Sequence, residues 1–336
     1  MNFKGKFGPL LIAEIGGNHE GDFKQALRLT ELAIESNADA IKFQIYEGDQ
    51  LVSSLESPDR NKHFKKFELT VEQHIELANM VKKAGRMYIA SVWDLKNLDW
   101  IDPHISIYKI GSGDLTAYPI LKEIAKRNKP MILSAGLANE VEVLDTIRFL
   151  QNVNPFYKEK DNLAILQCTT MYPIKESDAN LNVMETFRQK TGLTIGFSNH
   201  LEDSYGIEVA VSAGAEVIEF HFTDTRFGKV FRDHKLSYTK DDVHILIEKI
   251  KRINTLKGSY VKTPIPIEIE NNNEVSFRRA VYPSREILEG EMFTSDNLTV
   301  LRPNHGIDAR DFDKIIGKKA KVALAKHQKL SWDLIK

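Results

Sequence analysis

Eight short apolar segments, most of them followed by a stretch with helical spacing of apolar residues, constrain the fold of this chain more than any other feature. The helical patterns are clear at residues 118–128, 140–150, 204–213 and 240–255, whereas the connection after Trp93 is short and predicts no clear helix. Eight strand-then-helix units in about 250 residues favour a closed parallel (β/α)8 (TIM) barrel. The predicted strands are residues 10–15, 40–45, 88–92, 107–110, 131–133, 163–168, 194–197 and 217–222.

The alternative to a closed barrel is an open, doubly wound parallel sheet. Such a sheet would normally place a glycine-rich phosphate-binding turn directly after its first strand. The residues there, Gly16-Gly17-Asn18-His19, do not have that spacing. The barrel is therefore the better prediction. Asp22, a little further along, is expected to cap the first helix.

The sequence pattern changes after residue 256. Residues 257–274 contain Pro264, Pro266 and three consecutive asparagines, which is typical of a linker. Residues 275–336 hold short elements separated by turn signals. We therefore expect a barrel at 1–256, a linker at 257–274 and a small domain at 275–336, which would be marginally stable alone and would lean on the barrel or on another subunit.

Composition excludes several classes of protein. The chain has 46 basic and 47 acidic residues, a formal net charge of -1, so a nucleic-acid partner is not expected. Cys168 is the only cysteine of the 336 residues, which rules out an intrachain disulfide and favours a reducing compartment. Apolar runs fall far short of the ~20 residues of a membrane helix, and the start resembles no signal peptide. We expect a soluble cytoplasmic protein with no membrane partner.

Polar residues stand where the predicted strands end. In a parallel barrel the carboxyl ends of the strands meet around the active site. Polar groups inside core strands are costly unless they serve a purpose. The candidates are Glu14, Lys42, Gln44, Ser91, Lys109, Ser112, Asp114, Ser134, Thr169, Thr170, Ser198, Asn199, His200, Glu219 and His221.

His200 and His221 end adjacent strands, so their imidazoles are expected to be neighbours. Together they could bind a divalent cation, with Mn²⁺, Fe²⁺, Co²⁺ and Zn²⁺ all accepting such ligands. Only two protein ligands would leave positions open for water and a substrate oxygen, which suits catalysis more than a structural ion. The alternative is a pair of hydrogen-bonded core histidines.

Lys42 and Lys109 interrupt otherwise apolar strands. Lysines that point into a barrel mouth favour an anionic guest, and with Ser112 and Ser134 nearby a phosphate plus a carboxylate would fit. The alternatives are lysines in a structural ion pair or with heads reaching solvent, and a Schiff-base lysine of an aldolase.

Glu14 and Asp114 are candidates for proton transfer or for binding sugar hydroxyls, although either could instead pair with one of the lysines. Cys168 lies within a strand and is interpreted as a buried small residue rather than a nucleophile. The basic segment at residues 59–66 is interpreted as a solvated loop, with a lid over an anionic substrate as the alternative.

The chain resembles the sialic acid synthase family, the phosphoenolpyruvate-condensing nonulosonate synthases, over essentially its whole length. The C-terminal part, from Arg278-Arg279 through Arg302-Pro303 to Ile316-Gly317-Lys318, resembles the antifreeze-like (SAF) domain. The barrel motifs that carry the resemblance are Ile12-Ala13-Glu14-Ile15-Gly16-Gly17-Asn18-His19-Glu20-Gly21, Ile41-Lys42-Phe43-Gln44, Tyr108-Lys109-Ile110-Gly111-Ser112-Gly113-Asp114, Cys168-Thr169-Thr170-Met171-Tyr172-Pro173, Ser198-Asn199-His200, Glu219-Phe220-His221-Phe222-Thr223 and Asp233-His234-Lys235.

The resemblance implies a barrel, a SAF domain and a domain-swapped homodimer. It implies condensation of phosphoenolpyruvate with an N-acylated mannosamine-type sugar, with release of phosphate, and a divalent metal, foremost Mn²⁺, with Mg²⁺ or Co²⁺ as alternatives. By resemblance, His200 and His221 are metal ligands, Glu14 and Asp114 catalytic carboxylates, and Arg302 a sugar contact from the partner subunit. The remaining implied substrate contacts are Lys42, Lys109, Ser112, Ser134 and Ser198 for phosphoenolpyruvate, and Gln44, Tyr172 and Asp233 for the sugar.

Five residues depart from the family pattern. Asp114 replaces a glutamate, and Thr170, at a position implied to bind substrate, replaces an asparagine or serine. Val92, Asn199 and Phe220 replace a threonine, an aspartate and a lysine. These changes could alter the sugar or weaken the reaction, so a barrel that only binds carbohydrate remains the rival from outside the enzyme class.

Overall fold

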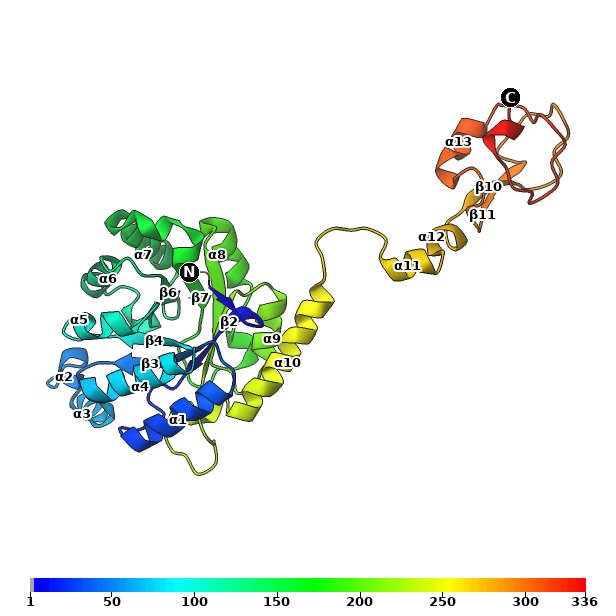
Figure 1. The fold of residues 1–336 in the computed structure, drawn as a ribbon. Helices are drawn as coiled ribbons and strands as arrows, with labels where there is room; N and C mark the ends of the chain where they lie inside the picture. The colour runs from blue at the N-terminus through cyan, green and yellow to red at the C-terminus, as the bar shows by residue number, and fades with distance from the viewer. Residues whose placement is uncertain (1–2) are drawn as a thin grey trace. The chain divides into compact units, whose positions relative to one another are not determined.

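The computed structural model of the protein describes residues 3–336. The chain divides into two compact units, Met1–Gly258 and Ser259–Lys336. In the described part of the first unit, eight parallel strands pair in sequence order and the last pairs with the first, from Leu10↔Val217 to Glu14↔His221. This closure confirms the (β/α)8 barrel and excludes the open sheet (Figure 1).

The elements of the barrel lie close to their predicted positions. The strands are β2 (Gly8–Glu14), β3 (Ala40–Ile45), β4 (Met87–Val92), β5 (Tyr108–Ile110), β6 (Met131–Ser134), β7 (Leu163–Gln167), β8 (Thr194–Asn199) and β9 (Val217–His221), with the short β1 (Lys4–Gly5) antiparallel to β2. The main helices are α1 (Phe23–Glu35), α4 (Val71–Lys83), α6 (Tyr118–Ala125), α7 (Glu140–Val153), α8 (Val183–Thr191), α9 (Tyr205–Ser212) and α10 (Lys240–Lys257).

Helix starts follow from local side-chain chemistry. The Asp22 carboxylate accepts hydrogen bonds from the backbone N–H groups of Lys24 and Gln25, so its predicted capping of α1 is confirmed. At α4, Thr70 and Gln73 form a reciprocal capping box. These caps fix where each helix begins, and with it the length of the loop that carries site residues.

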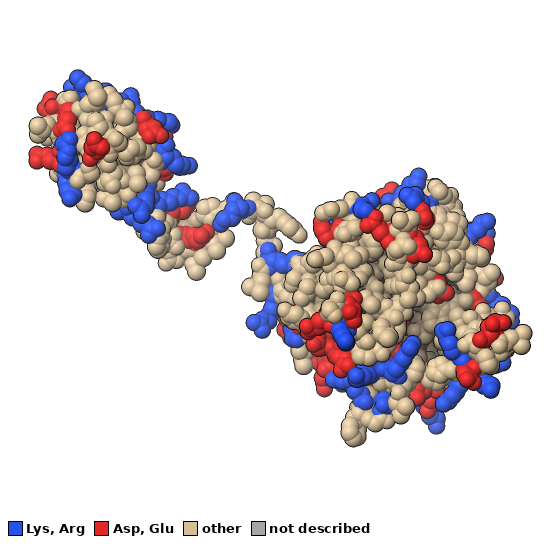
Figure 2. Space-filling view, turned by 180° about the vertical axis from the view of Figure 1, so that it is seen from behind, with Lys and Arg blue, Asp and Glu red and all other residues tan. Residues whose placement is uncertain are grey.

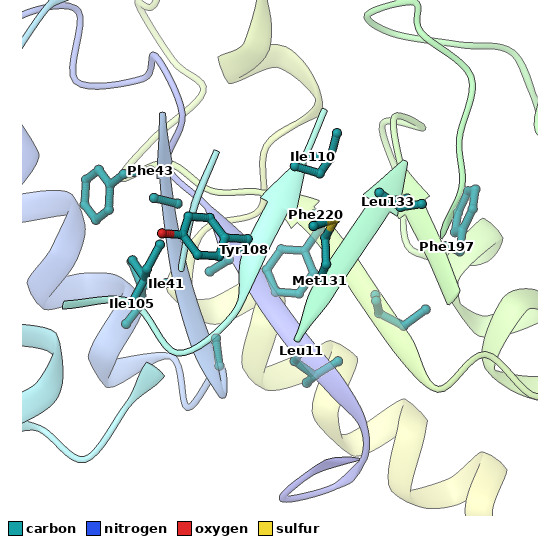
Figure 3. Packing of buried hydrophobic residues seen from close by; sticks show 14 of the residues in the cluster. Leu11, Ile41, Phe43, Ile105, Tyr108, Ile110, Met131, Leu133, Phe197 and Phe220 are labelled. Atoms are coloured by element: carbon teal, nitrogen blue, oxygen red, sulfur yellow. The ribbon is translucent and has the colours of Figure 1, made fainter. Parts of the chain in front are cut away.

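Side chains alternate between two apolar layers along each strand. Figure 3 shows Phe43, Tyr108 and Leu133 projecting from β3, β5 and β6 into the packing outside the barrel. Their neighbours point inward, where Ile12, Ile132 and other buried residues form a separate cluster. Because side chains alternate with period two, residues two positions beyond the inner cluster also face inward, at the carboxyl ends.

One local prediction needs correction, and the structure adds short helices to two further segments. The basic segment predicted as a loop at residues 59–66 lies in helix α3 (Pro58–Phe67), where Phe67 is buried. The connection after Trp93 contains the short helix α5 (Leu98–Ile101), and α2 (Gly48–Leu51) precedes α3. Two short helices, α11 (Pro266–Glu270) and α12 (Asn273–Ser276), lie in or extend from the segment predicted as a linker.

The second unit has its own core. Strand β10 (Ala280–Pro283) pairs antiparallel with β11 (Leu298–Leu301), and α13 (Phe312–Ile315) follows. Its buried residues are Val281, Ile287, Phe293, Leu298, Ile307, Ile315, Ala320, Leu324, Leu330 and Ile335.

On the face shown in Figure 2, basic and acidic side chains are interspersed over the barrel unit.

No helix within residues 3–336 combines the length and the apolar character needed to cross a lipid bilayer.

Candidate functional site

The inner face of the barrel becomes polar at the carboxyl ends of its strands. On β2, β6 and β9, apolar inner residues are followed two positions later by Glu14, Ser134 and Glu219. All three side chains are buried. On each of these strands the inward-facing side chains therefore change from apolar to polar or charged over two residues.

Four charged side chains form a buried network in this layer. Lys42 Nζ lies 2.6 Å from Glu14 Oε2 and 4.0 Å from Glu219 Oε2. Lys109 Nζ lies 3.3 Å from Glu219 Oε1, which also accepts a hydrogen bond from Ser198 Oγ at 3.1 Å. Each lysine and glutamate of the network is at most 6% exposed. Two cations and two anions thus sum to zero charge.

The pKa values of the two carboxyl groups in the network shift in opposite directions. Burial raises the pKa of Glu14, despite the neighbouring Lys42 cation. Burial also opposes ionisation of Glu219, but Lys109 and Lys42 outweigh it and lower that pKa to about 2. Burial disfavours the charged form of Lys42, yet Glu14 and Glu219 raise its pKa. Glu14 and Glu219 together therefore favour the charged form of Lys42.

Parallel pairing of β2 with β3 places Gln44 beside Glu14, and the turn at Gly16 leaves room for both side chains. The Gln44 amide donates a hydrogen bond to Glu14 Oε1 at 2.8 Å. Gly16 has a positive φ of 52°, and a Cβ there would lie 2.9 Å from that same oxygen. The first strand of the barrel therefore needs glycine at this turn so that the carboxylate and amide can meet.

The hydroxyl groups of the site converge beside β6. Gly136 N donates to Ser112 Oγ at 3.1 Å. A Cβ on Gly136 would lie 2.2 Å from Thr170 Oγ1 and 2.7 Å from Ser112 Oγ, so glycine admits both side chains. The hydroxyls of Ser134 and Thr170 are buried without a hydrogen-bond partner in the described chain. Unpaired buried hydroxyls are uncommon and are consistent with groups that await a ligand.

The two histidines lie together, with Tyr172 against both. The ring centroids of His200 and His221 are 5.5 Å apart, and the Tyr172 ring lies 4.1 Å from His200 and 5.6 Å from His221. His200 Nδ1 is 2.7 Å from the carbonyl oxygen of Thr169, which assigns the proton to Nδ1 and leaves Nε2 as the lone-pair nitrogen. The 5.5 Å separation confirms the prediction that the two imidazoles are neighbours.

The donor set around the histidines suits a partly open cation site. His221 Nδ1 is buried without a hydrogen-bond partner, and the Asp233 carboxylate approaches it at 3.9 Å. No group of three or more His, Cys, Asp or Glu side chains within residues 3–336 converges closely enough to enclose a metal. The residues present fit a divalent cation that completes its coordination with water and substrate oxygens, and they do not fit a closed structural site.

Asp114 lies at the edge of the site in a 3₁₀ turn, Ser112–Asp114. Burial raises its pKa to about 6, and the neighbouring Lys109 lowers it less. Nearby, Trp93 Nε1 is buried without a hydrogen-bond partner. A carboxyl group with a pKa near neutrality can exist in both protonation states under ordinary conditions, which suits proton transfer.

A cavity of about 540 Å³ opens between the segments after β6 and β7 and helix α8, and among the candidate residues at the strand ends only Thr169 and Thr170 line it. It is lined by Cys168, Thr169 and Thr170 among others. Burial raises the pKa of the Cys168 thiol, so the interpretation of Cys168 as a buried small residue, not a nucleophile, fits the structure. Neither the charged network nor the two histidines line this cavity, so it flanks the site.

Three of the five departures from the family pattern lie outside the inner pocket. Val92 and Phe220 belong to the outer packing layer, and Phe220 lies 5.0 Å from the Tyr238 ring. Asn199 donates from its amide to the carbonyl oxygen of Leu201 at 3.2 Å and so shapes a loop. Strand alternation turns these three side chains outward, so an effect of theirs on the sugar or the reaction would have to be indirect.

Sequence analysis gives no role to two residues that the structure brings into the site. Glu219 was noted only as a polar strand end, yet it contacts Ser198 and both lysines. No sequence signal marks Arg232, whose guanidinium lies 4.7 Å over the Tyr172 ring and whose Nε lies 3.3 Å from Asp233 Oδ1. The sequence does contain a signal for Glu219, because it precedes His221 by two residues and therefore faces the same side of the strand. Arg302 belongs to the C-terminal unit.

The sequence matches the NeuB family over residues 29–262 and the SAF domain over residues 278–336. It is 33% identical to the N,N'-diacetyllegionaminic acid synthase of Campylobacter jejuni, covering 92% of this chain and 95% of that protein. It is 29% identical to the human N-acetylneuraminate-9-phosphate synthase, covering 97% and 92%.

The fold is similar to a crystal structure of N-acetylneuraminic acid (sialic acid) synthetase from Leptospira borgpetersenii serovar Hardjo-bovis. The TM-score is 0.73 at 29% identity, over 80% of this chain and 91% of that one. Together with the polar layer at the strand ends, these matches show that the chain belongs to the NeuB family of sialic acid synthases and contains a SAF domain at residues 278–336.

Proposed function

We propose that the protein condenses phosphoenolpyruvate with an N-acylated mannosamine-type sugar to give a nonulosonic acid and phosphate. The observation that carries this proposal is the buried pair Lys42 and Lys109 beside the imidazoles of His200 and His221. One half of such a site can bind a small dianion or trianion, and the other half can hold a carbonyl oxygen. That division matches a reaction between an enol phosphate and a sugar aldehyde.

The lysines and the hydroxyl groups would orient phosphoenolpyruvate. Lys42 and Lys109 supply charge-assisted donors for its carboxylate and phosphate, with Ser112, Ser134 and Ser198 as further donors. Because Glu14 and Glu219 already balance the two lysines, the added anion favours a protonated carboxyl group in the network. Glu14, whose pKa burial raises, is the member best suited to accept that proton.

The bond changes balance without any further reactant than water. C3 of phosphoenolpyruvate forms a bond to the sugar aldehyde carbon, whose oxygen gains a proton. Water adds at C2 and gives a proton to a carboxylate, and the resulting intermediate loses phosphate through C–O cleavage. Glu14 and Asp114 are the proposed proton carriers, and holding both substrates in one orientation is the main contribution of the other residues.

His200 and His221 would hold a divalent cation, Mn²⁺ foremost and Mg²⁺ or Co²⁺ as alternatives, which would supply Lewis-acid polarisation of a carbonyl oxygen. Gln44, Thr170, Tyr172 and Asp233 are the proposed contacts of the sugar. The relatives' names include N,N'-diacetyllegionaminic, pseudaminic and N-acetylneuraminic acid 9-phosphate synthases. The acceptor is therefore proposed at the level of this sugar class.

A Schiff-base aldolase is less consistent with the site. A nucleophilic amine must lose its proton, whereas Glu14 and Glu219 raise the pKa of Lys42. Borohydride trapping in the presence of a keto acid separates the two reactions, because only the Schiff-base route leaves a reduced adduct on lysine. We expect no adduct by mass spectrometry.

The main test is phosphate release from phosphoenolpyruvate with Mn²⁺ and a panel of acceptors, each repeated with chelator. The panel holds N-acetylmannosamine, its 6-phosphate and a 2,4-diacetamido-6-deoxy sugar. Chelator-sensitive release with one of them supports the proposal and names the acceptor. Sugar binding without phosphate release in the metal-loaded protein would instead favour a carbohydrate-binding role.

The proposal extends to a domain-swapped homodimer in the cytoplasm, with domain limits at 1–256 and 275–336. Arg302 of one subunit would then contact the acyl group of the sugar bound in the other. Arg302→Ala should raise the KM of the sugar more than that of phosphoenolpyruvate. Equal changes in the two KM values would contradict this role for Arg302.

A further inference from the structure

Trp93 lies directly after β4 and carries a hydrogen-bond donor to which the proposed condensation gives no role. Its Nε1 is buried and has no hydrogen-bond partner among the described residues. A buried N–H without an acceptor costs free energy, and native proteins keep few of them. The other tryptophan of the barrel unit, Trp100, shows the usual solution, because its Nε1 donates to Asn97 Oδ1 at 2.7 Å. The unpaired donor of Trp93 therefore needs an explanation.

Neighbouring aromatic rings and the backbone hold the indole of Trp93 in place. The Tyr46 ring stacks on it, with centroids 5.2 Å apart and an interplanar angle of 19°. The Phe64 ring of α3 meets the indole edge-on, at 6.2 Å and 87°. Trp93 N also donates to the carbonyl oxygen of Ile45, at the end of β3, at 3.0 Å. None of these contacts involves Nε1, so the ring is fixed while its donor stays available.

The carboxyl group of Asp114 faces the same point beside Gly111. A Cβ placed on Gly111 would lie 3.7 Å from Trp93 Nε1 and 3.8 Å from Asp114 Oδ2. Glycine leaves that point without a side chain that would separate the two groups. Within residues 3–336 the Asp114 carboxyl group forms no ion pair and no side-chain hydrogen bond, whereas neighbouring side chains contact both oxygens of Glu14. A donor without an acceptor and an acceptor without a donor therefore meet at one glycine.

We propose that Trp93 is a positioning residue for Asp114, with its indole N–H donating a hydrogen bond to the ionised Asp114 carboxylate during the reaction. This role deepens the proposed condensation and rests on it, because Asp114 is one of the two proposed proton carriers. A carboxylate accepts more strongly from an N–H group than a protonated carboxyl group does. The bond would form as Asp114 loses its proton, and it would hold the carboxylate in one orientation for the next proton transfer.

Few other charged groups act on this pair. Burial raises the pKa of Asp114, and Lys109 on β5 lowers it less. Burial also raises the pKa of Tyr46, and Glu68 acts in the same direction, so the phenol stays neutral. The guanidinium of Arg60 on α3 lies 5.9 Å over the neighbouring phenylalanine ring and keeps its charge. Tyr46 and Arg60 therefore do not change their charge in the range in which Asp114 titrates.

The first test reads the pair in the full chain without turnover. The indole N–H signals of the three tryptophans are followed by ¹H–¹⁵N NMR from pH ~5 to ~8, and that of Trp93 is identified by its loss in Trp93→Phe. We expect the Trp93 proton signal to move downfield as the pH rises through about 6, and not to move in Asp114→Asn. The Trp100 signal should not follow this titration. If Trp93→Phe does not fold, Trp100→Phe and Trp332→Phe identify the Trp93 signal by elimination.

The second test measures whether the pair serves the reaction. Trp93→Phe keeps an aromatic ring and removes the donor, so Asp114 should become an about tenfold weaker acid, measured by ¹³C NMR of labelled aspartate. The kcat for phosphate release should fall about tenfold at pH ~6, with both KM values within about twofold of the wild type. The low-pH limb of kcat should move up by about one pH unit, since the ionised carboxylate accepts the proton of water. Trp100→Phe is the matched control and should change neither quantity, and thermal melting shows whether both variants are folded.

Failure of the inference and failure of the condensation give different results. A Trp93 signal that does not respond to the ionisation of Asp114 would overturn the inference. So would a folded Trp93→Phe protein with the kcat and pH profile of the wild type. If the wild type released phosphate with no acceptor while the Trp93 signal still followed Asp114, the hydrogen-bonded pair would stand and the condensation that it is proposed to serve would be rejected.

Discussion

The two ends of the barrel interior differ sharply, although the same strands build both. On β6, Ile132 is buried among apolar side chains, and Ser134, two residues later, has a buried hydroxyl without a partner. On β9 the same step leads from Val217 to Glu219. One end satisfies every group by packing, whereas the other keeps charges and hydroxyls whose partners would be substrates. We infer that the apolar end contributes to stability alone, whereas the polar end carries the chemistry and depends on mutual pairing of its charges.

The largest expected effect lies at the polar end and concerns activity. His221→Ala should lower kcat/KM by at least about 10³-fold, because it removes one of two imidazoles proposed to hold the cation. Its unfolding midpoint in urea should stay near that of the wild type. His244→Ala, at a histidine on α10 outside the site, is the matched control and should leave both quantities unchanged. Full metal-dependent activity in His221→Ala would refute its role as a ligand.

The charged network should show the next largest effect, this time on stability. Lys109→Met leaves Glu219 buried with less compensation, so the free energy of unfolding should fall by about 3–5 kcal/mol. The double variant Lys109→Met/Glu219→Gln should be less destabilised than the sum of its two single variants. Urea titrations of the four proteins at one pH measure this coupling. Strict additivity would show that the two side chains do not stabilise each other.

The apolar end should respond in stability alone. Ile132→Ala creates a cavity in the inner cluster and should lower the free energy of unfolding by about 2–4 kcal/mol. Below its melting temperature, the KM values for both substrates should stay within about twofold of the wild type. A selective loss of substrate affinity in Ile132→Ala would mean that the two ends are coupled, and the division between them would fail.

Strand alternation explains how much of this arrangement the sequence predicts. Period-two patterns place Lys42, Lys109 and the two histidines at one end of a closed barrel before any coordinates are known. They do not reveal which lysine a buried carboxylate contacts, because side-chain torsions decide that, and so the contacts of Glu219 escaped prediction. The helix at residues 58–67 also escaped, since its charged residues hide the burial of Phe67, which packs 5.1 Å from the Phe231 ring.

The smallest expected effect is at Asp114, where one substitution should change both stability and activity. Burial raises the pKa of Asp114 from 3.8 to about 6, so the folded state binds a proton more tightly than the unfolded chain. The associated stabilisation is complete below pH ~4 and is lost as the pH rises through 6. At pH 8 the wild type therefore holds a poorly solvated carboxylate, and Asp114→Asn should raise the free energy of unfolding by about 1–3 kcal/mol there.

The same substitution should reduce turnover, since an amide cannot transfer the proton. Urea unfolding at pH 4, 6 and 8 should show the difference between Asp114→Asn and the wild type shrinking toward zero at the acid end. Glu123→Gln, at a partly exposed carboxyl group on α6 that pairs with Lys126, should show no such stabilisation at pH 8. If Asp114→Asn were less stable than the wild type at pH 8, the carboxylate would be a structural partner of Lys109 instead. A more stable but less active variant would show that this carboxyl group is retained at a cost to folding, as expected of the polar end.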